Sequence, residues 1–323
     1  MAWSGKTIDL SDYSIQEALG KSLRVLKSDE YPPVSDLVSR VSALGPEGQR
    51  FLSDILRVYE NAYLSEEERG RINDSTGLAT LFDDFIKKNR CPNRYAKEKV
   101  WSAYGYPEGY RMKTVQEQEA ILRRHFPALG TKEDDLQQLA KRPLPLRAEW
   151  AVIPRWEKIG ATYCEAIQKV FSLISIERRF TNTCKDRLND RSLMQTGKAI
   201  EAWKKLGEEQ TGDILVVATQ FGIRYRGCSV RCATDSMYSY EFGLGTFAVA
   251  CMLLTHPKRE VKWEQLHPEC GGDYFTPIVG EQLVRTPVFS YRSGELKLDS
   301  VQIDNPGDGF GCASGFLPQA ESA

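Results

Sequence analysis

The chain has 323 residues, with 43 Lys and Arg against 44 Asp and Glu, which gives a formal net charge of -1. Domains usually contain roughly 100–200 residues, so this length favours two domains. The balanced charge excludes a global attraction to nucleic acid or to an anionic membrane, and any such binding requires a local patch.

The first residues do not resemble a secretory signal, and the eight cysteines are spread over the chain. No apolar run reaches the roughly 20 residues that a membrane-spanning helix needs. We therefore expect a cytoplasmic protein with reduced thiols and no membrane contact.

Helical spacing dominates the first two hundred residues. Ser14-Ile-Gln-Glu17 is a capping box, in which the hydroxyl and the carboxylate satisfy unpaired amides at a helix start. It predicts a helix over residues 14–28, and apolar spacing predicts three more over residues 34–41, 51–63 and 78–86. Two further capping boxes begin at Thr114 and Thr131.

A proline-rich stretch at residues 141–147 favours an extended linker, which would subdivide the helical domain near residues 142–155. Helical spacing resumes at Ile159 and ends near Glu177. Another helix is predicted over residues 199–208.

The pattern changes after Gly212. Four runs favour strands: residues 214–219, 261–263, 288–291 and 296–303. Ser293-Gly294 predicts a hairpin turn, a break in period near Asp299-Ser300 indicates a bulge or a turn, and the glycine-rich tail at residues 305–315 predicts irregular structure. The nearly uncharged segment 242–255 predicts buried core.

These elements predict an α+β protein. A mostly α-helical domain over residues 1–205 would precede a smaller α+β domain over residues 206–323, built on a short and mainly antiparallel sheet.

Four residues form a candidate zinc site. Cys228 and Cys232 are four positions apart, and His267 and Cys270 are three apart. Thiolate and imidazole are ligands that tetrahedral zinc prefers. The alternative is that these cysteines are buried as small apolar residues.

Cys228 is also a candidate nucleophile, because it follows Gly227 in a positively charged segment. Positive charge favours the reactive thiolate. The general base would be His256 or His267, with Asp273 orienting the latter. Under the alternative hypothesis, the nearby arginines form a solvated or phosphate-facing loop. These arginines are Arg224, Arg226 and Arg231.

The same arginines, together with Tyr225, form a candidate nucleic-acid contact, since aromatic rings stack on bases and arginines neutralise phosphates. Further basic clusters lie at residues 87–99 and 178–187. No helix-turn-helix or finger pattern supports sequence-specific reading. Residues 243–248 match the letters of a dinucleotide-binding turn, but residues 237–242 are not the buried strand such a turn needs, so close helix packing is expected.

Three functions remain open. The leading hypothesis is a non-enzymatic accessory protein that docks a protein partner through its helical part, because most of the chain predicts amphipathic helix without catalytic spacing. The alternatives are a cysteine- or zinc-dependent enzyme centred on Cys228 and His267, and a nucleic-acid-binding accessory factor.

Overall fold

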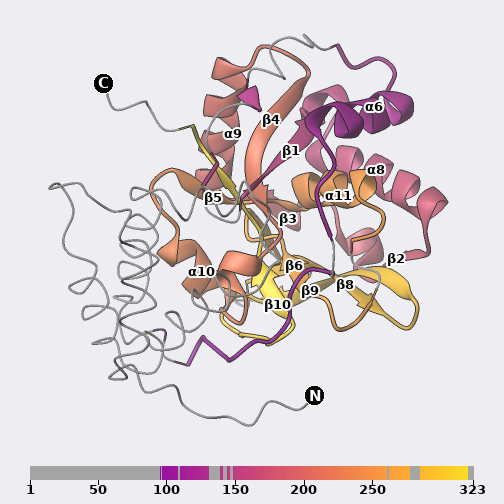
Figure 1. Cartoon of the computed structure of the whole chain (residues 1–323). Helices are drawn as coiled ribbons and strands as arrows, with labels where there is room; N and C mark the ends of the chain where they lie inside the picture. Colours follow the sequence, from indigo (N-terminus) through magenta and orange to yellow (C-terminus); the bar gives the residue numbers. More distant parts are fainter. Residues whose placement is uncertain are drawn as a thin grey trace, which may run out of the picture. The chain divides into compact units, whose positions relative to one another are not determined.

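The computed structural model describes residues 95, 97–107, 110–130, 139–140, 144–145, 148–259, 262–276 and 284–318 (Figure 1). The chain divides into two compact units, Met1–Asn93 and Arg94–Ala323, and every described residue belongs to the second. The helices predicted before residue 87 and the capping box at Thr131 lie outside the described residues.

The prediction of a mostly α-helical N-terminal part followed by a smaller α+β part is wrong. The described residues form eleven strands in two sheets and only five α-helices. Three strands lie in the region predicted to be helical: β1 (Glu149–Pro154), β2 (Phe180–Asn182) and β3 (Leu193–Gln195). Two of them have only three residues, which is too short to show a period of two.

The first sheet has four antiparallel strands in the order β1-β4-β11-β5. Its long strands are β1 and β4 (Ile214–Gln220), and every residue of β4 is buried. The apolar run at residues 214–219 is therefore a strand, as predicted. The short strands are β5 (Glu241–Gly243) and β11 (Ser314–Phe316).

The second sheet has the order β10-β6-β8-β7-β3, with β9 pairing both β8 and β2. Its remaining members are β6 (His267–Glu269), β7 (Asp273–Phe275), β8 (Arg285–Arg292), β9 (Glu295–Gln302) and β10 (Phe310–Cys312). The predicted β8–β9 hairpin is present, and both turn residues, Ser293 and Gly294, have positive φ angles of 57° and 80°.

Two predictions about this region are wrong. The β8–β9 register runs without a break from Arg285↔Gln302 to Arg292↔Glu295, so there is no bulge at Asp299. The glycine-rich tail is also not irregular throughout, because it contains β10 and most of β11. Strand partners, and not local sequence, impose the extended conformation there.

Five α-helices accompany the sheets: α6 (Val115–His125), α8 (Tyr163–Glu177), α9 (Gly197–Glu209), α10 (Val230–Ser236) and α11 (Thr246–Thr255). The predicted capping box at Thr114 is present at the start of α6. All ten residues of α11 are buried, and this helix contacts α8 and β1 (Figure 1). None of the helices in the described ranges is both long and apolar enough to span a bilayer.

Two buried glutamine side chains bond to backbone groups of the first sheet that no neighbouring strand in the described ranges pairs with. The Gln118 amide donates to Trp150 O and accepts from Val152 N on the outer edge of β1. The Gln210 amide makes the same pair of bonds to the N–H and C=O of Val216 in β4, at 2.8 and 2.9 Å. Each side chain therefore replaces one residue of a neighbouring strand.

The two sheets meet where the β5–α11 turn contacts the β6–β7 turn. Gly272 N donates to Leu244 O at 3.0 Å. A Cβ atom on Gly272 would lie 2.4 Å from the carbonyl oxygen of Gly243, so the two backbones touch without room for a side chain. The chain passes from β10 to β11 through Ala313 at this junction, and Ala313 N donates to Glu269 O.

Candidate functional site

The segment between β4 and α10, residues 221–229, makes two tight turns. Gly222 and Gly227 have φ angles of 106° and 74°, which favour glycine. A Cβ on Gly222 would lie 2.3 Å from Gly311 O in β10, and one on Gly227 would lie 2.2 Å from Val100 O. This segment is therefore enclosed between β10 and the residues around Val100.

Residues 97–106, which we term the strap, run along this turn. Val100 N donates to Gly227 O at 2.7 Å, and Lys99 forms an antiparallel bridge with Cys228. Glu98 fastens the strap, because its carboxylate accepts from Ser229 Oγ at 2.6 Å and from Arg231 Nη2 at 2.5 Å. The strap thus fixes the backbone on both sides of Cys228.

Cys228 directly precedes Ser229, the N-cap of α10. The hydroxyl of Ser229 accepts from Cys232 N at 3.0 Å. In a capping box the side chain three residues after the cap folds back toward it. Here that side chain is the Cys232 thiol, and its hydrogen bond to Cys228, together with burial, raises the pKa of Cys232. Cys228 therefore affects the protonation of the Cys232 thiol.

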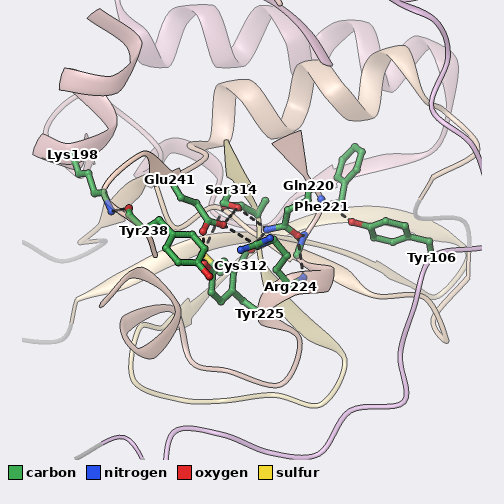
Figure 2. Close-up of polar contacts among 12 residues, drawn as sticks. Tyr106, Lys198, Gln220, Phe221, Arg224, Tyr225, Tyr238, Glu241, Cys312 and Ser314 are labelled. Atoms are coloured by element: carbon green, nitrogen blue, oxygen red, sulfur yellow. Dashed lines mark hydrogen bonds and ion pairs between the residues drawn. The ribbon is translucent and has the colours of Figure 1, made fainter. Parts of the chain in front are cut away.

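The same turn contributes Arg224 and Tyr225 to a buried network centred on Glu241 (Figure 2). The Glu241 carboxylate accepts from Tyr225 OH at 2.7 Å and from Ser314 Oγ at 2.6 Å, and lies 3.4 Å from Arg224 Nε. Burial, and then the charge of Glu241, raise the pKa of Tyr225. The Arg224 guanidinium also lies over the Tyr238 ring, 5.6 Å from its centroid.

The four residues predicted to bind nucleic acid lie on this one turn and its helix, but their polar groups contact the protein itself. Arg224 forms an ion pair with Glu241, and Tyr225 OH donates a hydrogen bond to it. Arg226 Nη1 donates to the strap at Tyr104 O, and Arg231 pairs with Glu98.

The three predicted catalytic residues lie on different elements: Cys228 before α10, His267 in β6 and Asp273 in β7. Within the described ranges, the hydrogen-bond partners of Asp273 are Thr246 N at 2.6 Å and Tyr163 OH at 3.1 Å. Burial raises the pKa of Asp273 to about 6 against the effect of these bonds. Neither of the candidate bases, His256 and His267, is among these partners of Asp273. His256 instead accepts from Lys113 N at 2.9 Å.

The predicted zinc ligands Cys232 and Cys270 have different neighbours. The pKa of the Cys232 thiol is shifted by Cys228, whereas that of the Cys270 thiol is shifted by Asp273, Thr246, Cys312 and Glu269. Across the described ranges, no group of three or more His, Cys, Asp or Glu side chains is arranged to hold a metal ion. Zinc binding stays a prediction.

Sequence reasoning missed Glu269, which follows His267 by two positions in β6. Its side chain is fully buried, and neither carboxyl oxygen has a hydrogen-bond partner among the described residues. Burial raises the pKa of Glu269 to about 8, so it is mostly protonated at neutral pH. The only signal in the sequence is an acid between apolar neighbours in the short run Leu266–Cys270.

No protein-family model matches the chain, and neither the curated proteins nor the solved structures give a match. A functional assignment therefore has to be argued from the geometry of the site.

Proposed function

We propose that the protein is a cysteine-dependent enzyme in which Cys228 is the reactive thiol. The observation that carries this proposal is the partial exposure of Cys228, directly before α10. Cys228 is half-buried, whereas the other six described cysteines are buried. A thiol that solvent reaches and that accepts a hydrogen bond is the one suited to act as a thiolate.

The charge around Cys228 and Cys232 supports the same assignment. Lys99 bridges to Cys228, and its positive charge acts on the Cys232 thiol in the direction that lowers the pKa. A nearby cation stabilises the thiolate form of a cysteine. The strap also holds the Cys228 backbone, so little ordering is needed before a reaction.

The buried cysteines differ from Cys228 in their tendency to form a thiolate. Burial raises the pKa of Cys164 to about 12 and that of Cys184 to about 11. Such groups remain thiols at neutral pH, and the thiol is a poor nucleophile. Reactivity confined to Cys228 is therefore the distinguishing expectation.

The docking function was predicted from a helical part over residues 1–205, of which residues 1–94 lie outside the described ranges, and it stays a prediction. The nucleic-acid hypothesis gains little support from the turn, since Arg224 and Arg231 are engaged with Glu241 and Glu98.

Iodoacetamide labelling of the native full-length chain, followed by peptide mass mapping over time, tests the proposal. We expect Cys228 to be alkylated at least about tenfold faster than Cys184, because only thiolates react. Cys228→Ser should abolish the fast phase, Lys99→Gln should slow it, and the matched control Cys184→Ser should leave it unchanged. Fast labelling at one of the six buried cysteines of the described ranges, or none at Cys228, would refute the proposal.

A further inference from the structure

We infer that the rings of Tyr106, Tyr110 and Phe221, which we term the cage, form a binding site for a guanidinium cation. Arg259 fills this site from within the chain, and its presence there holds the strap against the turn that carries Cys228. The inference goes beyond the reactivity proposed for Cys228 and does not depend on it.

Three aromatic rings lie around the guanidinium of Arg259. Its Cζ lies over the Tyr106 ring at 4.5 Å from the centroid, over the Phe221 ring at 5.2 Å and over the Tyr110 ring at 5.7 Å. A cation within about 6 Å of a ring centroid is attracted by the negative face of the ring. Arg259 is completely buried, which is rare for an arginine without stabilising neighbours. The cage therefore replaces part of the water that the cation has lost.

The shape of the cage favours a planar cation. The Tyr106 ring is inclined by 70° to that of Tyr110 and by 85° to that of Phe221, so the rings form separate walls and not one stack. While Arg259 lies over these rings, its Nη2 donates to Leu266 O at 2.9 Å. A guanidinium can stack on a ring and donate in its own plane, which a compact ammonium group does less well.

The Tyr106 phenol stays neutral at ordinary pH. Burial raises the pKa of Tyr106 to about 12, although the charge of Arg259 acts in the opposite direction. The ring therefore offers a neutral aromatic face to the cation, and the attraction does not depend on an ionised phenol.

The cage holds one end of the strap. Tyr106 is the last residue of the strap, and its hydroxyl accepts from Phe221 N at 2.9 Å (Figure 2). Glu98 fastens the other end to Ser229. Between these two contacts, Val100 N donates to Gly227 O at 2.7 Å. A filled cage therefore keeps the strap paired with the turn, and an empty cage removes one of its two fastenings.

Hydrogen exchange of the full-length chain, read by mass spectrometry of peptides, tests this role of Arg259. In Arg259→Ala we expect the amides of residues 97–106 to exchange at least about tenfold faster, because opening the strap no longer separates a cation from three rings. The β8–β9 hairpin should exchange as before. Arg292→Ala is the matched control, since Arg292 lies over the exposed Trp263 ring at 4.9 Å and should leave strap exchange unchanged.

Methylguanidinium and its neutral counterpart methylurea, at equal millimolar concentrations, test the class of ligand. In Arg259→Ala we expect methylguanidinium to slow the exchange of the strap toward the rate of the unmodified protein, and methylurea to have no effect. Neither compound should act on the strap of the unmodified protein, where Arg259 fills the cage. Equal effects of the two compounds, or no effect of methylguanidinium, would show that the cage does not select a cation.

Arg259→Lys decides the question if Arg259→Ala does not fold, because lysine keeps the charge and loses the planar head. Faster exchange that is confined to the strap supports the inference. Unchanged exchange in the strap, or an equal increase throughout the described unit, would show that Arg259 does not hold the strap. These readouts do not involve the Cys228 thiol, so they are independent of the alkylation experiment.

Discussion

Glu269 holds a proton inside the folded protein, because burial raises the pKa of its carboxyl from 4.5 to about 8. Between these values the folded state binds more protons than the unfolded state does. This contribution to stability is therefore fully present below pH 4.5 and is lost as the pH rises to about 8. Glu269→Gln keeps the shape and removes the titration. We expect this variant to be more stable than the unmodified protein at pH 9, by about 1–3 kcal/mol, in urea unfolding.

The exposed neighbour Glu264 provides the matched control, and Glu264→Gln should unfold as the unmodified protein does at both pH 6 and pH 9. An equal loss of stability between these pH values in Glu269→Gln and in the unmodified protein would show that Glu269 does not titrate as described.

His256 changes the stability with pH in the opposite direction to Glu269, because it is buried in its neutral form. Its Nε2 accepts from Lys113 N at 2.9 Å, and burial lowers its pKa from 6.5 to about 4. The stability that it contributes is present above pH 6.5 and is lost as the pH falls toward 4, by at most about 1.4 kcal/mol per pH unit. His256→Gln should reduce the difference in melting temperature between pH 7 and pH 5.

His125 near the end of α6 is the control for this measurement, since its Nε2 lies 3.8 Å from a Glu177 oxygen that is reached by solvent. His125→Gln shows how far the loss of a histidine at another position changes the same difference in melting temperature. If His125→Gln flattens the curve and His256→Gln does not, the assignment to His256 is incorrect.

At the scale of elements, Gln210 joins the end of α9 to the unpaired side of β4. It is the C-cap of α9, and its amide satisfies both backbone groups of Val216. Gln210→Met retains the volume but leaves a buried N–H and C=O unsatisfied. We expect a loss of about 2–4 kcal/mol in urea unfolding and faster hydrogen exchange at Val216.

Gln168 lies on the exposed side of α8, so Gln168→Met tests whether the loss at Gln210 reflects the two hydrogen bonds. The control should change stability by less than about 0.5 kcal/mol. Similar losses in both variants would indicate a general intolerance of methionine.

Helices and strands whose apolar residues keep a regular spacing over many positions were predictable from the sequence. The helices α8 and α9, the strand β4 and the β8–β9 hairpin all follow from apolar spacing or turn residues. Strands of three residues, such as β6 and β10, carry no period and form because neighbouring strands pair with them. The strands β2 and β3 have three residues each and were missed for the same reason. The longer strand β1 was missed as well, and the fold class was therefore wrong.

The candidate site was predictable only where its residues are close in sequence. The Cys228–Cys232 spacing indicated a pair, and Cys228 is the largest cause that raises the pKa of the Cys232 thiol. Glu98 fastens Ser229 across 131 positions, and no local pattern indicates such a contact. The orphaned carboxyl of Glu269 is likewise a product of the tertiary structure.

At the scale of the whole described unit, the contact between the β5–α11 and β6–β7 turns joins the two sheets. A Cβ on Gly272 would lie 2.4 Å from Gly243 O and 2.6 Å from Gly245 N, both backbone atoms. Gly272→Ala should therefore force the turns apart and lower stability by about 3 kcal/mol or more. The urea midpoint measures this loss.

Gly197→Ala is the matched control, because nothing lies within 4 Å of a Cβ at that position. Its stability should be unchanged or slightly higher, since alanine restricts the unfolded chain. An unchanged urea midpoint in Gly272→Ala, as in Gly197→Ala, would mean that the turns can separate without consequence for the sheets.

The unpartnered carboxyl of Glu269 also makes unfolding a proton-releasing process. Near pH 7 the folded chain holds a proton that the unfolded chain gives up, because the pKa of Glu269 falls from about 8 toward its usual value. The buffer must absorb that proton, and its heat of ionisation adds to the heat of unfolding. The calorimetric enthalpy of this protein at one pH therefore depends on the choice of buffer, and the Glu269→Gln variant reduces that dependence.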